Sequence, residues 1–261
     1  MKLSVRESGF REPVSEYPLD WALGRIKELG YDGVELCMVP DRVRRWPRAT
    51  RRGAWYSEYD AEGRKKLRQR AESLGLEIPT LSSDWAWGYS EFNPDLSQWD
   101  RGVEIIGEDV EFARDVGARA ILIHFGVSTG TWEQAKRLLG RAADHAAARG
   151  IVLGFEGSIW FRAGLGGQET LVRMVDEIGS PGLKIYVHPH GDTAQQVKDV
   201  EEVGDRICAL HASALDDKVD YGQVFAALKK VGYDWYWCFE VGGDLIAKSV
   251  QPWRELARRY A

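Results

Sequence analysis

The chain has 261 residues, of which 44% are hydrophobic and 29% charged, and its formal net charge at pH 7 is −5. This composition is typical of a soluble globular protein, and the negative charge argues against a general affinity for nucleic acid. We expect a cytoplasmic protein without a membrane partner, because no apolar run could span a bilayer, the charged N-terminus does not resemble a signal peptide, and three cysteines in apolar contexts favour reduced thiols.

Eight short apolar segments bounded by turn residues predict β-strands. In chain order they are Lys2–Arg6, Gly33–Met38, Leu76–Ser82, Arg119–Phe125, Ile151–Glu156, Leu183–His188, Ile207–His211 and Trp235–Val241. Amphipathic patterns between them predict helices at Leu19–Leu29, Asp60–Leu74, Val103–Val116, Trp132–Arg149, Glu169–Ile178, Ala194–Val203, Tyr221–Val231 and Val250–Tyr260. Strands and helices therefore alternate along the whole chain.

Seven glycines support this alternation, because each follows a helical pattern and precedes a strand pattern by a few residues. They are Gly30, Gly75, Gly117, Gly150, Gly179, Gly204 and Gly232. A helix commonly ends on a residue with positive φ, a conformation that glycine adopts without a steric penalty.

Eight strands alternating with eight helices over about 250 residues is the pattern of a (β/α)8 barrel. The alternative is a doubly wound open sheet, which usually carries a glycine-rich phosphate loop after its first strand. The segment Glu7–Pro13 follows the first predicted strand and lacks such a loop. We therefore predict an α/β protein with a single TIM-barrel domain over residues 1–261, since no change in composition marks a linker.

The fifth to eighth predicted strands end on or near Glu156, His188, His211 and Glu240. In a barrel of this kind the carboxyl ends of the strands meet on the catalytic face. Each residue alone could be an ordinary hydrogen-bonding group, but four on adjacent strands favour a shared site. Two carboxylates and two imidazoles suit a divalent ion better than a Ca²⁺ cage. We expect Mn²⁺ first, with Co²⁺, Zn²⁺ or Mg²⁺ as alternatives.

The sequence around these residues resembles the xylose isomerase-like TIM barrel superfamily, which includes sugar isomerases and epimerases and endonuclease-related members. The resemblance lies in Glu156 within Gly-Phe-Glu, His211 within Cys-Ala-Leu-His and the stretch Val219–Glu240, while Gly30–Leu36 is similar to the family's second strand. The resemblance implies that Glu156, His211 and Glu240 bind the metal. It also implies that the two glutamates act as acid and base.

The sixth strand departs from the family pattern, which usually has an aspartate at this point. Aligning His188 with that aspartate brings Pro189 onto the family's proline. An alignment shifted by one residue places Val187 there instead and puts His190 at a histidine of the motif. The shifted alignment leaves the metal one ligand short.

The resemblance implies a metal-dependent isomerase or epimerase that acts on a sugar or a sugar derivative. Glu156 and Glu240 would remove and return a proton through an enediolate. After His211 the family commonly continues with lysine and aspartate, whereas this chain has Ala212–Ala214. The same enediolate could therefore expel a β-substituent, as in a lyase or dehydratase acting on a cyclitol or C-glycoside. A DNA-repair endonuclease is less favoured, because such members of the family assemble a multi-zinc cluster from many ligands and this chain has only five histidines. A sugar-binding protein without metal is a further alternative.

Other residues are expected near the site. Glu35 and His124 end the second and fourth strands. Each either reaches the pocket behind the residues that hold the metal or forms hydrogen bonds at the barrel mouth. Aromatic and basic residues in loops after strands, which could contact substrate or pack on the rim, are Trp85, Trp87, Trp160 and Arg162. The arginine-rich segment Arg42–Arg52 could bind an anionic substrate or form the interface of a homo-oligomer, or it could be a solvated loop.

Overall fold

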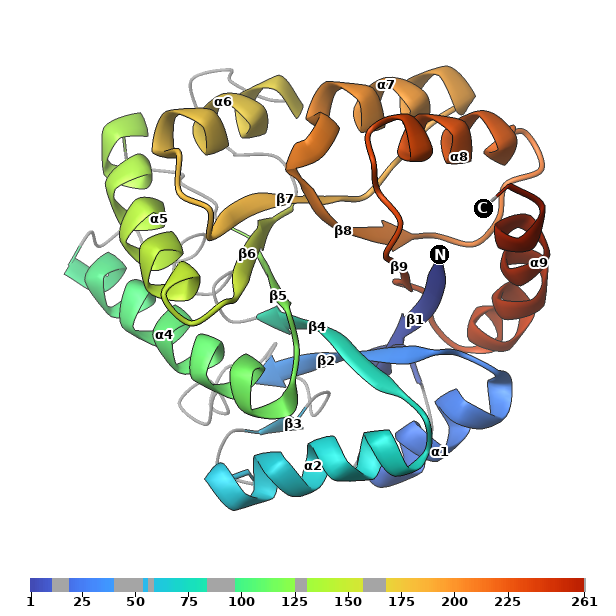
Figure 1. The fold of residues 1–261 in the computed structure, drawn as a ribbon, viewed down its shortest axis with the longest axis horizontal. Helices are drawn as coiled ribbons and strands as arrows, with labels where there is room; N and C mark the ends of the chain where they lie inside the picture. The colour runs from blue at the N-terminus through green and yellow to red at the C-terminus, as the bar shows by residue number, and fades with distance from the viewer. Residues whose placement is uncertain are drawn as a thin grey trace.

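The structure is a computed structural model that describes residues 1–10, 19–39, 54–55, 59–83, 97–124, 131–156 and 168–260. Figure 1 shows these residues as a ring of helices around a barrel of strands. The architecture is a single (β/α)8 barrel, which confirms the predicted fold class.

All strand pairs in the barrel are parallel. The barrel strands are β1 (Lys2–Arg6), β2 (Gly33–Val39), β4 (Glu77–Ser83), β5 (Ala120–Ile123), β6 (Val152–Phe155), β7 (Leu183–Val187), β8 (Ile207–Ala212) and β9 (Tyr236–Phe239). Each pairs with its neighbours in the order β1-β9-β8-β7-β6-β5-β4-β2, and pairing of β1 with β2 closes the barrel. A two-residue strand, β3 (Ala54–Trp55), pairs with β2 and was not predicted.

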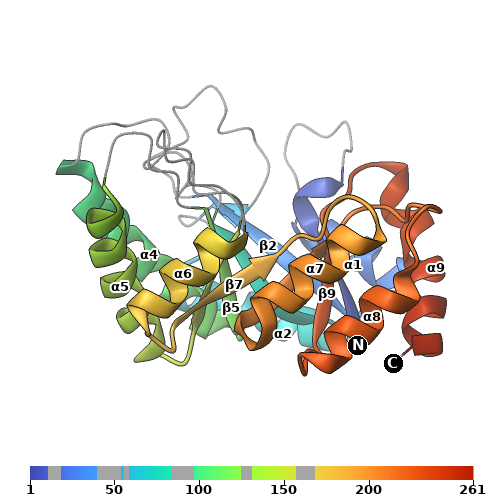
Figure 2. The same cartoon turned by 90° about the horizontal axis from the view of Figure 1, so that it is seen from above.

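The helices follow the strands in alternation and cover the outside of the barrel. They are α1 (Leu19–Leu29), α2 (Ala61–Ser73), α4 (Ser97–Val116), α5 (Trp132–Ala147), α6 (Gln168–Ile178), α7 (Thr193–Val203), α8 (Tyr221–Lys230) and α9 (Asp244–Tyr260), with short 3-10 helices η1 (Glu7–Gly9) and η4 (Gly204–Arg206). Figure 2 shows them running alongside the strands in the side view. Within the described residues, no helix is both long and apolar enough to cross a membrane.

The predicted elements agree with the observed ones except at some boundaries. The seven glycines expected at helix ends all have positive φ, between 62° and 89°. Two helices begin about six residues earlier than predicted, α4 at Ser97 and α9 at Asp244. In α9 the added turn buries Ile246 against the barrel, so tertiary packing stabilises a turn that the local pattern did not indicate. Pro252 consequently lies inside this helix and not near its start.

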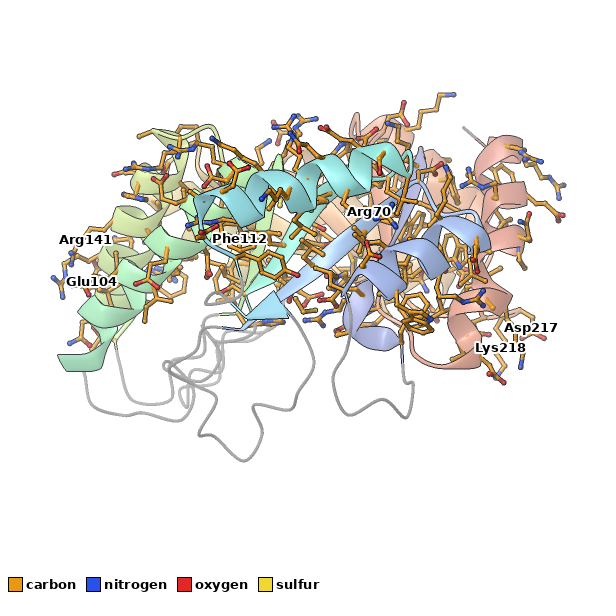
Figure 3. All side chains as sticks on the ribbon, turned by 90° about the horizontal axis from the view of Figure 1, so that it is seen from below. Arg70, Glu104, Phe112, Arg141, Asp217 and Lys218 are labelled. Atoms are coloured by element: carbon orange, nitrogen blue, oxygen red, sulfur yellow. The ribbon has the colours of Figure 1, made fainter. Side chains whose placement is uncertain are left out.

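The hydrophobic core lies between the strands and the helices. Figure 3 shows Phe112 between α2 and α4, whereas charged side chains such as Glu104 and Arg141 lie at the outer edge of the helix ring. The buried indole of Trp237 on β9 donates a hydrogen bond from Nε1 to the carbonyl of His211 at 3.0 Å. This contact ties β8 to β9 at the level of the candidate site.

The three cysteines are free thiols, as predicted. Cys37 and Cys238 are buried, and Cys208 is half-buried. Burial raises the pKa of the Cys208 thiol to about 12 and that of Cys238 to about 11, so both are protonated near neutral pH.

Candidate metal centre

Four side chains with metal-binding groups meet at the carboxyl ends of β6, β7, β8 and β9. They are Glu156, His188, His211 and Glu240, and one ligand atom of each lies within 4.8 Å of the others. Three of them come directly after their strands, and His211 is the penultimate residue of β8. The backbone amides of Glu156 and Glu240 continue the sheet ladder by donating to Ile123 and Ala212 at 3.0 Å. The carboxylates are therefore held at rigid strand ends.

The atoms that face one another have the spacing that ligands have around one ion. His188 Nδ1 lies 3.4 Å from Glu156 Oε1 and 3.5 Å from Glu240 Oε2, and His211 Nδ1 lies 3.5 Å from Glu240 Oε2. A tetrahedral ion about 2.1 Å from each ligand separates its ligands by about 3.4 Å. The contact between Glu156 Oε1 and His211 Nδ1, at 2.7 Å, is a hydrogen bond that would have to lengthen. The donor set and its spacing fit a divalent ion.

His211 is oriented from behind by a buried carboxylate. Its Nε2 lies 3.0 Å from Glu35 Oε1, and both side chains are fully buried. Glu35 Oε2 accepts hydrogen bonds from the Tyr186 hydroxyl at 2.7 Å and from Thr80 Oγ1 at 2.8 Å. A histidine that ligates a metal through one nitrogen usually donates its other N–H to such a partner. Glu35 is therefore fully buried behind His211, a candidate ligand, and supports it by a hydrogen bond.

His188 is oriented in a similar way. Its Nε2 lies 3.2 Å from Ser213 Oγ, which leaves Nδ1 facing the centre. The exposed His190 ring packs on His188 with ring centroids 4.2 Å apart, and it is outside the four-residue cluster. Val187 is fully buried in the hydrophobic core. Of the residues at the end of this strand, His188 is therefore the one whose side chain belongs to the cluster.

Each carboxylate also has an outer partner. His124 Nε2 lies 2.7 Å from Glu156 Oε2, so the expected residue at the end of β5 does touch the site. Arg6, the last residue of β1, donates from Nη1 to Glu240 Oε1 and from Nη2 to Ser82 Oγ. The sequence reasoning missed Arg6, although it ends a predicted strand and the rule that selected His124 would have found it.

The electrostatics show how strongly these groups are coupled. Burial alone raises the pKa of Glu35, but His211 and Arg6 outweigh it and lower that pKa to about 2. Burial likewise opposes ionisation of Glu156, yet His211 and His124 hold its pKa well below the ordinary value. Burial lowers the pKa of His211, but the carboxylates of Glu35 and Glu156 raise it well above its usual range. The centre therefore attracts positive charge. A proton and a metal ion compete for His211 Nδ1, because the nitrogen can bind only one of them at a time.

We expect Glu35→Gln to weaken binding of a divalent ion by about 10- to 100-fold, the usual effect of removing a carboxylate behind a ligating histidine. The amide has the same shape but no charge, so His211 loses its fixed orientation and part of its basicity. Titration of metal-free protein with Mn²⁺ measures the change. The exposed Glu72, paired with Arg68 on α2, provides the control variant Glu72→Gln. Equal affinities of Glu35→Gln and the parent would show that Glu35 has no such role.

Several expected residues lie outside the described part of the structure. These are Trp85, Trp87, Trp160, Arg162 and the segment 42–52.

A family model described as xylose isomerase-like TIM barrel matches residues 23–260. A search of curated proteins gives no significant match. Among solved structures, a D-tagatose 3-epimerase-like protein superposes with a TM-score of 0.75 at 20% identity, covering 100% of this chain and 98% of its own.

Two further solved structures are similar over nearly the whole chain. An L-ribulose 3-epimerase has a TM-score of 0.74 at 17% identity, covering 99% of this chain and 96% of its own. A D-psicose 3-epimerase from Clostridium cellulolyticum H10, solved with D-tagatose, has a TM-score of 0.72 at 13% identity, covering 100% and 99%. At these identities the likeness shows a shared fold.

Proposed function

Because the chain belongs to the xylose isomerase-like TIM barrel family, we propose that it is a divalent-metal-dependent isomerase or epimerase of a sugar or sugar derivative. The observation that carries the proposal is the convergence of two carboxylates and two imidazoles on one point at the carboxyl ends of four strands. The fold shared with structures named as sugar 3-epimerases supports it.

Glu156, His188, His211 and Glu240 would hold the ion. Mixed oxygen and nitrogen ligands are compatible with Mn²⁺, Co²⁺ and Zn²⁺, and less so with Mg²⁺, which prefers oxygen alone. We place Mn²⁺ first among them. When bound, the ion supplies a Lewis acid that polarises the carbonyl and adjacent hydroxyl of the sugar and so makes the neighbouring C–H proton more acidic.

The chain's own residues then move the proton. Glu156 is a candidate base, because it is ionised and lies at the centre, with Oε2 directed to His124 at 2.7 Å. The imidazole of His124 is placed to exchange a proton with that oxygen. Return of the proton to the neighbouring carbon gives isomerisation, and return to the opposite face gives epimerisation. Glu240 is the second carboxylate at the site and the other candidate for these transfers.

The proposal is tested with protein purified without chelator. We expect about one divalent ion per chain, and with Mn²⁺ present the protein should incorporate solvent deuterium next to the carbonyl of a ketose and form a new isomer. Protein stripped of metal should do neither. A sugar-binding protein would bind a ketose without exchange. The proposal would be contradicted if the protein bound none of Mn²⁺, Co²⁺, Zn²⁺ and Mg²⁺. It would also be contradicted if no ketopentose or ketohexose incorporated solvent deuterium.

A lyase or dehydratase is the second candidate. It is favoured by Ala212–Ala214, which replaces the lysine and aspartate expected after His211. Ser213 in this segment is hydrogen-bonded to His188 at 3.2 Å and so belongs to the site itself. The same proton abstraction followed by loss of a β-substituent would give an unsaturated carbonyl compound. Product analysis by ultraviolet absorbance and NMR separates this outcome from a change of stereochemistry.

A further inference from the structure

In Glu156 and Glu240, one carboxylate oxygen faces the other candidate ligands and is called the inner oxygen. The second, outer oxygen faces away from them, and the two outer oxygens have different partners. The inner oxygen of Glu240, Oε2, lies 3.5 Å from Nδ1 of both His188 and His211. Its outer oxygen, Oε1, accepts a hydrogen bond from the guanidinium of Arg6. The outer oxygen of Glu156 lies instead against the imidazole of His124.

The guanidinium of Arg6 is itself fixed by the barrel. Its Nε donates to Cys37 Sγ at 2.9 Å on β2, and its Nη2 donates to Ser82 Oγ on β4. Nε also lies 3.7 Å from Glu35 Oε1, and the side chain is 12% exposed. All three nitrogens of the group are therefore engaged by protein atoms. These contacts fix the position of the guanidinium beside Glu240.

The chemistry of the two outer partners differs. A guanidinium stays protonated and only donates hydrogen bonds, so it holds the carboxylate oxygen that it contacts. An imidazole can give or accept a proton. Consequently Glu240 Oε1 is held in a charge-assisted hydrogen bond, and rotation of the carboxylate that would bring both oxygens to the centre is opposed.

We propose that Arg6 is a positioning residue that makes Glu240 a one-oxygen ligand of the divalent ion and withholds its other oxygen from proton transfer. The inference rests on the proposed metal-dependent function. Proton removal at this centre then belongs to the Glu156 side, next to His124. Return of the proton from that same side gives isomerisation, so this inference favours the isomerase over the epimerase. The carboxylates of Glu35, Glu156 and Glu240 and the guanidinium of Arg6 together carry two net negative charges. A divalent ion neutralises them when both histidine ligands are neutral.

The test compares Co²⁺ binding by four proteins: the parent, Arg6→Met, Arg6→Lys and Arg25→Met. Arg25 is exposed on α1 and paired with Glu28, so Arg25→Met controls for loss of an arginine. Co²⁺ is added to metal-free protein, and its visible absorption, which depends on the number and arrangement of ligands, is recorded. Thermal unfolding without metal reports any loss of stability.

In Arg6→Met we expect altered Co²⁺ bands and an affinity about tenfold or more lower, because Glu240 is no longer held with one oxygen inward. Arg6→Lys keeps a cation beside Oε1, so its bands and affinity should lie closer to those of the parent. Arg25→Met should match the parent. If Arg6→Met does not fold, Arg6→Gln, which is neutral but can still bond Ser82, is expected to give the same altered bands.

Three results would overturn the inference. Parent-like bands and affinity in Arg6→Met would show that Arg6 does not position Glu240, even if the variant unfolds at a lower temperature. Tighter binding in Arg6→Met would show that Arg6 acts only as a repelling charge. If the parent binds none of Co²⁺, Mn²⁺, Zn²⁺ and Mg²⁺, the proposed function and this inference fall together, which distinguishes that failure from the other two.

Discussion

Replacing Glu156 with glutamine is expected to lower the rate of solvent-deuterium exchange into a ketose substrate by about 10²- to 10⁴-fold at saturating Mn²⁺. Glutamine keeps the shape of the side chain and an oxygen that can ligate the ion, but it cannot accept the substrate proton. The loss should therefore appear mainly in kcat. The rate of deuterium incorporation, followed by NMR, measures it.

Two controls separate the roles of the residues around Glu156. Glu72→Gln, on the exposed face of α2, should exchange at the parent rate. Glu240→Gln should bind Mn²⁺ more weakly but retain more exchange than Glu156→Gln once saturated, if Arg6 restricts Glu240 to ligation. Bound metal is measured for every variant, so that loss of the ion is not mistaken for loss of the base. Exchange by Glu156→Gln at the parent rate would exclude Glu156 as the base.

Removal of divalent ions with a chelator is expected to lower the thermal midpoint by about 5–10 °C relative to protein with free Mn²⁺ at about 100 times its dissociation constant. The ion binds the folded barrel and not the unfolded chain, because four strand ends must meet to form the site. Differential scanning calorimetry measures the shift. In His188→Asn, which removes a half-buried candidate ligand, most of the difference in midpoint between metal-bound and metal-free protein should disappear. An equal midpoint with and without ions would contradict a resident metal.

This stabilisation should depend on pH through His211. Burial alone lowers its pKa, but Glu35 and Glu156 raise it well above the usual 6.5 in the absence of an ion. The folded protein then binds this proton more tightly than the unfolded chain, so the proton stabilises the fold fully below about pH 6.5 and less as pH rises through the raised pKa. The ion needs neutral imidazole. The increase in midpoint on adding Mn²⁺ should therefore grow from about pH 6 to about pH 8, and a constant increase would argue against ligation by His211.

The alternation of strands and helices could be predicted because its signals are local. Apolar runs and glycines at helix ends identified every barrel strand and every one of the eight described α-helices. Boundaries were less accurate where packing decides them, as in α9, whose first turn is stabilised by burial of Ile246. The short β3 offered too few residues for any periodic pattern.

The candidate site was partly predictable for a related reason. Parallel strands in a closed barrel end on the same face. The proximity of residues such as Glu156 and His211 can therefore be predicted from the order of the strands alone. The sequence left two roles open for Glu35. The structure places it at full burial behind His211, because its position on β2 directs the side chain to the barrel interior below the centre.

The sequence by itself determined which residues stand at strand ends, since strand limits follow from hydrophobic periodicity and turn residues along a short stretch of chain. Only the tertiary structure decided which atoms face one another. Closure of the barrel sets β1 beside β9 and so brings Arg6 to Glu240 across 234 positions of sequence. The partner of each carboxylate oxygen depends on strand register and side-chain packing, which no local pattern encodes.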